Sequence, residues 1–228
     1  MNRRLVTAII LLFACAGALS LAAHLFVVFP FDLKITHELQ EVENPVFAAI
    51  MQGVSELGEP WFEAILIAIV SAIFVARRQL LEAVFVIATA SSVVLTSAIK
   101  VLVGRPRPPL FLVNPADFFM AINRYSFPSG HVLFFVVFFG FIGYLAWVHL
   151  AGRTRMIVMA VCCALILLIA PSRVYLGAHW TSDVIGSYVI GVLWLIILVL
   201  AYQLALHRRD IRAAENLQES RSQVTTLK

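Results

Sequence analysis

Long apolar runs, separated by short polar segments, make up most of the chain. A helix that crosses a bilayer needs roughly 20 predominantly apolar residues, and six runs approach or exceed that length. They cover residues 5–29, 61–76, 80–103, 131–150, 156–170 and 184–206. The pattern therefore predicts an all-α bundle of six transmembrane helices, with both ends of the chain on one side of the membrane.

The composition agrees with a membrane protein. Of the 228 residues, 61% are hydrophobic and only 13% are charged, and the mean hydropathy is +0.94. A soluble domain of this length needs more charge on its surface. We find no internal repeat or second domain, so residues 1–206 form one predicted membrane domain. Residues 207–228 form a predicted cytoplasmic tail, either a fraying helix or disordered.

The basic residues orient the predicted helices. Loops on the cytoplasmic side of a membrane protein are enriched in Lys and Arg. The segments that would share this side contain Arg3, Arg4, Arg77, Arg78, Arg153, Arg155, Arg208, Arg209, Arg212, Arg221 and Lys228. We therefore expect cytoplasmic termini in a bacterial-type inner membrane, with segment 5–29 retained as a span rather than cleaved as a signal peptide. The net charge of +4 is spread over helix ends, which argues against nucleic-acid binding.

The first loop on the opposite side, residues 30–60, is acidic. It holds Asp32, Glu38, Glu41, Glu43, Glu56 and Glu59 against the single Lys34. Its apolar residues recur at roughly helical spacing, which predicts one or two amphipathic helices. The later loops on this side contain arginines instead, against the usual charge bias, and an anionic ligand would explain them.

The first of three polar clusters on this side follows the third apolar run. Lys100 ends the run, and Arg107 follows it after a proline turn. The planar guanidinium group of Arg matches phosphate oxygens, and Lys adds a mobile point charge. The same pair also fits interfacial cations whose long side chains reach the headgroups.

The second cluster, Ser126 to His131, precedes the fourth run. Pro128, Ser129 and Gly130 predict a tight turn into a helix N-terminus, where free N–H groups and the helix dipole favour an anion. His131 would lie in the first helical turn. A plain helix cap with a surface histidine is the alternative interpretation.

The third cluster lies between the fifth and sixth runs, where Pro171 is expected to end the fifth helix. It contains Arg173, His179 and Asp183. His179 and Asp183 are four residues apart and would share one helix face. A carboxylate beside one imidazole nitrogen orients the ring and leaves the other nitrogen free to attack. Alternatively, Asp183 caps the sixth helix and His179 faces headgroups.

Together, the clusters bring one Lys, two Arg, two His and one Asp to one membrane face. The three cysteines lie inside apolar runs without metal-ligand spacing and predict neither a disulfide nor a zinc site: Cys15, Cys162 and Cys163. This set of side chains suits phosphoryl chemistry without a metal. Cations stabilise the developing charge, one histidine attacks, and the other protonates the departing oxygen.

The clusters resemble the signature of the type 2 phosphatidic acid phosphatase superfamily, which includes vanadium haloperoxidases. That signature reads Lys, six residues, Arg-Pro; then Pro-Ser-Gly-His; then Ser-Arg, five residues, His, three residues, Asp. Here it is Lys100 to Pro108, Pro128 to His131, and Ser172 to Asp183. Every position of the signature is filled within residues 100–183.

The resemblance implies a role for each matching residue. His179 would be the nucleophile that forms a phosphohistidine, and Asp183 would orient it. His131 would be the general acid and then the base toward water. The phosphate would be held by Lys100, Arg107, Ser129, Gly130 and Arg173. Neither a metal nor another cofactor is expected.

Polar residues outside the signature receive simpler interpretations. Four loop residues are candidates for headgroup contacts: Arg105, Arg124, Tyr175 and Trp180. Glu63 and Glu82 lie near helix ends, where their side chains are expected to reach the interface.

We therefore expect a membrane lipid phosphatase with its active site on the outer, periplasmic face, acting on substrate that diffuses laterally in the bilayer. Undecaprenyl pyrophosphate is the favoured substrate, followed by phosphatidylglycerophosphate and then a lipid A phosphate. The sequence leaves open a lipid phosphotransferase and a non-enzymatic anionic-lipid binder or transporter. Six spans argue against haloperoxidase activity, and the oligomeric state is left open.

Overall fold

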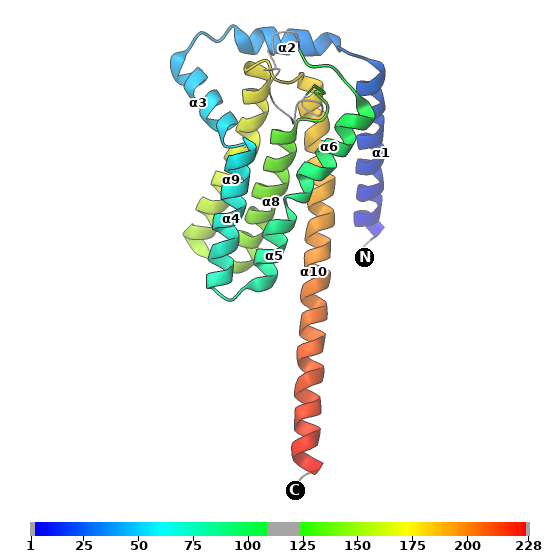
Figure 1. Ribbon diagram of the computed structural model, residues 1–228, viewed down its shortest axis with the longest axis vertical. Coiled ribbons are helices and arrows are strands. Elements are labelled where there is room, and N and C mark those ends of the chain that lie inside the picture. Colours follow the sequence, from blue (N-terminus) through cyan, green and yellow to red (C-terminus); the bar gives the residue numbers. More distant parts are fainter. Residues whose placement is uncertain (1–2, 109–123, 227–228) are drawn as a thin grey trace.

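The computed structural model describes residues 3–108 and 124–226, in which every regular element is an α-helix (Figure 1). The tail residue Lys228 and the stretch 109–123 of the proline-rich loop lie outside these ranges. The helices are α1 (Arg3–Leu25), α2 (Pro30–Gln40), α3 (Pro45–Glu56), α4 (Pro60–Ala76), α5 (Leu80–Ala88), α6 (Ser91–Val103), α8 (Gly130–His149), α9 (Gly152–Tyr175) and α10 (Thr181–Thr226).

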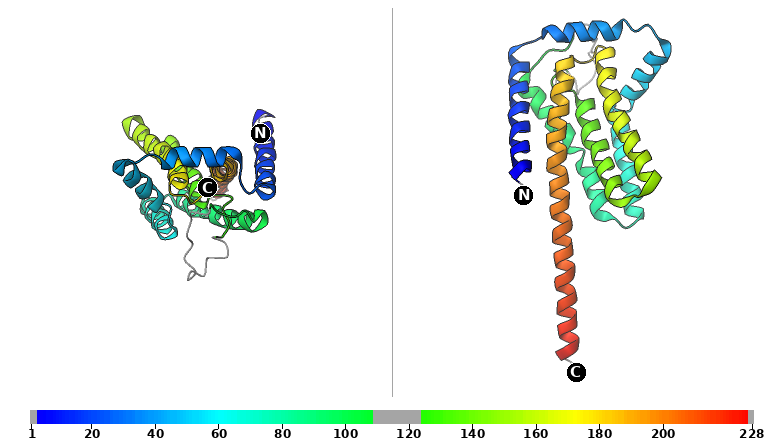
Figure 2. Two further views of the ribbon diagram at one scale, coloured as in Figure 1. Left: turned by 90° about the horizontal axis from the view of Figure 1, so that it is seen from above. Right: turned by 180° about the vertical axis from the view of Figure 1, so that it is seen from behind.

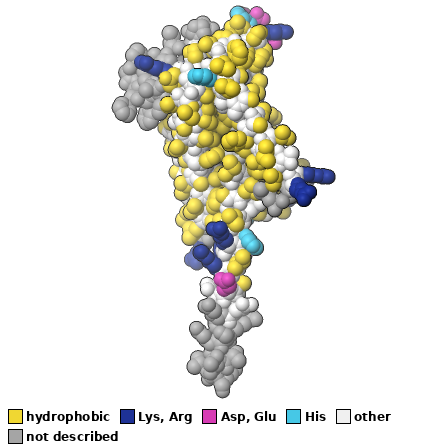
Figure 3. Space-filling view, turned by 90° about the vertical axis from the view of Figure 1, so that its right-hand side faces the viewer, with side chains coloured by type: hydrophobic (Ala, Val, Ile, Leu, Met, Phe, Trp, Pro, Cys, Tyr) yellow, Lys and Arg dark blue, Asp and Glu magenta, His cyan; other side chains and the backbone are white. Residues whose placement is uncertain are grey.

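The prediction of an all-α membrane bundle is confirmed. Five segments are long and apolar enough to cross a bilayer: α1, the α5–α6 pair, α8, α9 and α10. Helices α3 and α4 qualify only together and are bent by 66° at their junction, so the described helices give five spans, or six if this pair counts as one. On the face that Figure 3 shows, hydrophobic side chains cover the middle of the helix bundle, and charged side chains lie mainly above and below this apolar band.

Helix boundaries differ from the sequence prediction in two places. The expectation that Pro171 ends the fifth helix is wrong, because α9 continues through it to Tyr175. The final turn is stabilised by packing, since Ser172, Arg173 and Val174 are all buried. At the other end of the chain, α10 continues as one helix to Thr226, so the described part of the tail is helical.

Prolines and caps set where the outer helices begin. Helices α2, α3 and α4 each start with proline, whose fixed φ and missing N–H suit the first helical position. The side chain of Asn44 also accepts hydrogen bonds from the N–H groups of Val46 and Phe47 at 2.9 and 3.1 Å. The acidic loop, for which the sequence predicts one or two helices, thus contains two, α2 and α3.

Helix α8 lies at the centre of the bundle, and α2 lies across one end of it (Figures 1 and 2). Five phenylalanines of α8 are at most 8% exposed: Phe134, Phe135, Phe138, Phe139 and Phe141. They pack inside the protein rather than against lipid. The beginning of α1 and the long extension of α10 lie toward the end opposite α2 (Figure 1).

A buried charge network fixes α2 to the bundle. Arg105, which follows α6, donates to Asp32 of α2 at 2.9 Å and to Asp183 of α10 at 2.5 Å. Asp32 also accepts from the backbone N–H and the hydroxyl of Ser182, both at 2.8 Å. Both Arg105 and Asp32 have fully buried side chains. The network therefore joins α2, α10 and the loop after α6.

We predict that Asp32→Ala destabilises the protein by about 3 kcal/mol, because it removes one of the two carboxylates that compensate a buried guanidinium group. Lys34→Ala is the matched control on the same helix. Lys34 is 77% exposed, and its ion pair with Glu38 at 3.9 Å lies at the surface, where such pairs add little stability. Thermal unfolding of both variants in one detergent tests this. Equal unfolding midpoints for Asp32→Ala and the unmodified protein would contradict it.

Candidate active site

The three polar clusters meet at the end of the bundle that α2 covers. The end of α6 supplies Lys100, the start of α8 supplies His131, and the end of α9 supplies Arg173. His179 lies in the short connection between α9 and α10, with its side chain 2% exposed. Side chains from all three clusters lie close enough to act electrostatically on this imidazole.

His179 is held as a buried, neutral imidazole. Burial holds the pKa of His179 well below its ordinary value, and the surrounding cations lower it further. Those cations are Arg107, Arg173 and Lys100. A neutral imidazole has a free lone pair, which nucleophilic attack requires.

Asp183 lies on the Nδ1 side of His179. The distance from His179 Nδ1 to Asp183 Oδ2 is 3.6 Å, which is an ion-pair distance and longer than a hydrogen bond. The same oxygen accepts from the N–H of Trp180 at 2.9 Å, and Oδ1 accepts from Arg105 at 2.5 Å. The carboxylate is therefore fixed by other partners and faces the imidazole from the side, which leaves Nε2 for chemistry.

The cations are positioned by backbone and hydroxyl groups. Arg107 donates to the carbonyl oxygen of Ala178 at 3.0 Å, directly before His179. Arg173 donates through Nη1 to the hydroxyl of Ser55 on α3. Burial lowers the pKa of Arg107 to about 10, while Asp183 opposes this shift, so the guanidinium group stays charged at neutral pH. Lys100 is 5% exposed at the end of α6.

A tight turn leads into α8. The N–H of Ser129 donates to the hydroxyl of Ser187 at 2.7 Å, which fixes the start of α8 against α10. The hydroxyl of Ser129 is buried without a hydrogen-bond partner in the described part of the chain, as is Nε of Arg173. Gly130 is the first residue of α8, where backbone N–H groups have no partner within the helix.

His131 has an acidic neighbour that the sequence analysis did not identify as part of the site. Its Nε2 lies 3.6 Å from Oε1 of Glu59, the residue that precedes α4. Gly58 packs directly on the ring: a Cβ atom at this position would lie 2.4 Å from Cδ2 of His131. The α3–α4 junction therefore holds the imidazole between a glycine and a carboxylate. Glu59 lies at the break between α3 and α4, and no spacing in the sequence links it to His131.

Two of the four candidate headgroup contacts have structural roles instead. Arg105 is 1% exposed and forms the ion pairs with Asp32 and Asp183. Trp180 is 4% exposed, and its indole N–H donates to the carbonyl oxygen of Pro106 at 3.2 Å. Tyr175 makes an edge-on ring contact with Phe47 at 5.1 Å, and Arg124 is exposed.

The expectation that Glu63 and Glu82 reach the interface is also wrong. The two residues are 9% and 3% exposed. Glu82 accepts a hydrogen bond from Tyr202 at 3.0 Å, so it pairs inside the bundle. In the ranges 3–108 and 124–226, no three His, Cys, Asp or Glu side chains are grouped so that they could hold a metal ion.

Comparison with known proteins identifies relatives of similar sequence. The chain is 28% identical to phosphatidylglycerophosphatase B of Bacillus subtilis over 179 residues, covering 77% of this chain and 85% of that protein. It is 31% identical to an undecaprenyl-diphosphatase of Sulfolobus acidocaldarius over 124 residues, covering 50% of this chain and 52% of that protein.

Two crystal structures are similar to the fold. A transmembrane PAP2-type phosphatidylglycerolphosphate phosphatase from Bacillus subtilis superposes with a TM-score of 0.71 at 26% identity, covering 83% of this chain and 93% of that one. Aquifex aeolicus LpxE superposes with a TM-score of 0.56 at 20% identity, covering 75% of this chain and 96% of that one. At this identity, the similarity concerns the fold alone.

The PAP2 superfamily itself matches residues 79–206, more than half of the chain, and this range includes every position of the three clusters. PAP2 phosphatases are hydrolases that act without a metal. The chain is therefore a multi-pass membrane lipid phosphatase that belongs to the PAP2 superfamily.

Proposed function

We propose that the protein hydrolyses the terminal phosphate of a membrane lipid through a phosphohistidine on His179. The observation that carries this proposal is the convergence of two buried cations, Lys100 and Arg173, and the half-buried Arg107 on a neutral, buried imidazole. Buried cations need anionic partners, and a phosphate group would supply several negative oxygens at once. Ser129 Oγ and Arg173 Nε are buried donors that such a group would satisfy.

In the first step, Nε2 of His179 attacks phosphorus, and the bond between phosphorus and the lipid oxygen breaks. Lys100, Arg107 and Arg173 stabilise the charge on the phosphate oxygens. His131 donates a proton to the departing oxygen, so the lipid leaves as an alcohol or as a shorter phosphate. Asp183 stabilises the positive charge that develops on His179.

In the second step, water attacks the phosphorus of the phosphohistidine. His131, now neutral, takes the proton from this water, and the bond between phosphorus and nitrogen breaks. Inorganic phosphate leaves and His179 returns to its neutral form. Glu59, 3.6 Å from Nε2 of His131, is the acidic group placed to form an ion pair with this imidazole when it is protonated, before the first step and after the second.

Two lipid classes are candidates for the substrate. Similarity to phosphatidylglycerophosphatase B over most of both chains supports phosphatidylglycerophosphate. Undecaprenyl pyrophosphate, which the sequence analysis favours, is supported by the shorter match to an undecaprenyl-diphosphatase. The signature residues contact only phosphate and do not distinguish the two. We place phosphatidylglycerophosphate first because its support spans more of the chain.

We further propose that the site faces the outside of an inner membrane and that both termini are cytoplasmic. The basic residues that flank the spans support this orientation. A reporter enzyme that works only in the cytoplasm should be active when it is fused after Lys228. Activity of a reporter that requires the periplasm would contradict the orientation.

The histidine roles predict distinct losses. His179→Ala should lower kcat by about 10³-fold or more for every substrate, because no nucleophile remains. His131→Ala should lower kcat for a lipid phosphate by about 10²- to 10⁴-fold. It should lower the rate of the phosphorylation step less with an aryl phosphate, because that leaving group needs no proton. Phosphate release and the burst of aryl alcohol measure the two effects.

His37→Ala is the control for these variants, because His37 is exposed on α2 at the same end of the molecule. It should keep full activity. Substantial turnover by His179→Ala would overturn the assigned nucleophile. If His131→Ala slowed the phosphorylation step equally with the lipid phosphate and with the aryl phosphate, the assigned acid would be overturned.

The proposed chemistry requires only side chains of the protein. Dialysis against EDTA should therefore leave kcat for lipid phosphate within about twofold of its starting value. Phosphate release before and after dialysis, and again after adding Mg²⁺ or Zn²⁺, measures this. A loss that a metal ion restores would contradict the mechanism.

A further inference from the structure

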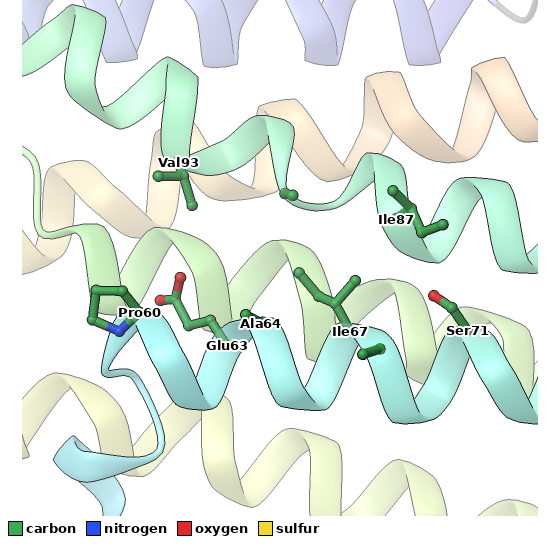
Figure 4. A pocket seen from close by; sticks show the side chains of 9 residues that line it. Pro60, Glu63, Ala64, Ile67, Ser71, Ile87 and Val93 are labelled. Carbon is green, nitrogen blue, oxygen red and sulfur yellow. The ribbon is translucent and has the colours of Figure 1, made fainter.

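A cleft separates α4 from the α5–α6 pair within the span of the membrane (Figure 4). Its volume is about 510 Å³, and its walls are almost entirely apolar. Helix α4 contributes Ala64, Ala68 and Ser71, which lie along one side of that helix. These side chains are too small to fill the space opposite them.

The opposite wall is formed where α5 and α6 separate. The break lies at Thr89 and Ala90, where the hydroxyl of Thr89 donates to the carbonyl oxygen of Val86 at 2.6 Å. Ile87 before the break and Val93 after it line the cleft and remain 55% and 47% exposed. The cleft is therefore open toward the surrounding lipid.

The end of the cleft that Pro60 and Glu63 line, here called the upper cleft, lies beside the active site. Glu59, 3.6 Å from His131, directly precedes Pro60, which lines the cleft. Glu63 follows Glu59 by four residues and lies one helical turn deeper along α4. A lipid with its phosphate at His131 would thus have its adjoining groups at the level of Glu63.

Glu63 is the polar side chain whose carboxyl group points into the upper cleft (Figure 4). The residue is only 9% exposed. In the described part of the chain its carboxyl group has no hydrogen-bond donor or cation as a partner, and the charged group nearest along the helix is the carboxylate of Glu59. Buried polar groups normally have a partner, so the chemistry of this position calls for a donor from a ligand.

We propose that this cleft binds the hydrocarbon chain of the lipid substrate and that Glu63 accepts a hydrogen bond from a hydroxyl group on the lipid's glycerol unit. This inference rests on the proposed lipid phosphatase function and extends it to the choice of substrate. A glycerol unit next to the reacting phosphate carries a hydroxyl group, whereas a polyprenyl chain presents only C–H groups. A polyprenyl pyrophosphate would leave Glu63 without a partner, so the cleft selects the glycerol lipid.

Filling the cleft tests where the chain binds. Ala68→Trp should lower kcat/KM for phosphatidylglycerophosphate in detergent micelles on the order of 10-fold or more. It should leave kcat/KM for p-nitrophenyl phosphate, which has no lipid chain, unchanged. Ile69→Trp is the matched control, because Ile69 is the next residue of α4, is 54% exposed and does not line the cleft.

The two substrates separate failure of the cleft from failure of the phosphatase function. Unchanged lipid turnover by Ala68→Trp, or an equal loss in Ile69→Trp, would overturn the cleft as the binding site. Absence of phosphate release from every substrate by the unmodified protein would instead overturn the phosphatase function on which the inference rests.

Replacing Glu63 tests the selection. Glu63→Leu should reduce the ratio of kcat/KM for phosphatidylglycerophosphate to that for undecaprenyl pyrophosphate on the order of 10-fold, through loss of the first activity. Glu63→Gln keeps an acceptor oxygen and should retain most of the ratio. An unchanged ratio in Glu63→Leu, or an equal loss for both lipids, would overturn the role of Glu63.

Discussion

The carboxylate of Asp183 contacts both a structural ion pair and the imidazole of His179, and the arrangement of the site depends on it. One oxygen is bound to the buried guanidinium group of Arg105, and the other faces the Nδ1 side of His179. Because Arg105 also binds Asp32, the same ion pairs connect the surface helix α2 to the start of α10. The group proposed to orient the nucleophile is therefore held from the side opposite the nucleophile. Its position does not depend on a direct hydrogen bond to the imidazole.

Much of this molecule could be predicted from the order of its residues. Apolar runs identify the spans because a bilayer imposes a minimum helix length, and signature spacings identify Lys100, His131 and His179. Pairings between distant segments were not predictable in this way. Arg105 and Arg107 are nearly adjacent and chemically alike, yet one is used to bind carboxylates and the other lies at the imidazole. Hydropathy does not distinguish them.

The same limit applies to apolar residues and helix ends. Hydropathy scores the phenylalanines of α8 like lipid-facing residues, although tertiary packing buries them. It scores α4 as one more span, although α4 qualifies only with α3, at a bend that brings Glu59 beside His131. Pro171 weakens a helix locally, but buried Arg173 and its neighbours keep the last turn of α9 intact. In each case, contacts between helices outweigh a local tendency.

The length of α10 has a mechanical consequence. At 1.5 Å per residue, its 46 residues extend about 69 Å, which is more than twice the roughly 30 Å thickness of the hydrocarbon layer. One uninterrupted rod therefore runs from the turn that carries Asp183 to a polar stretch far beyond the opposite surface of the bilayer. A load applied to the far end of this rod acts through a long lever arm on the packing around the turn that carries Asp183.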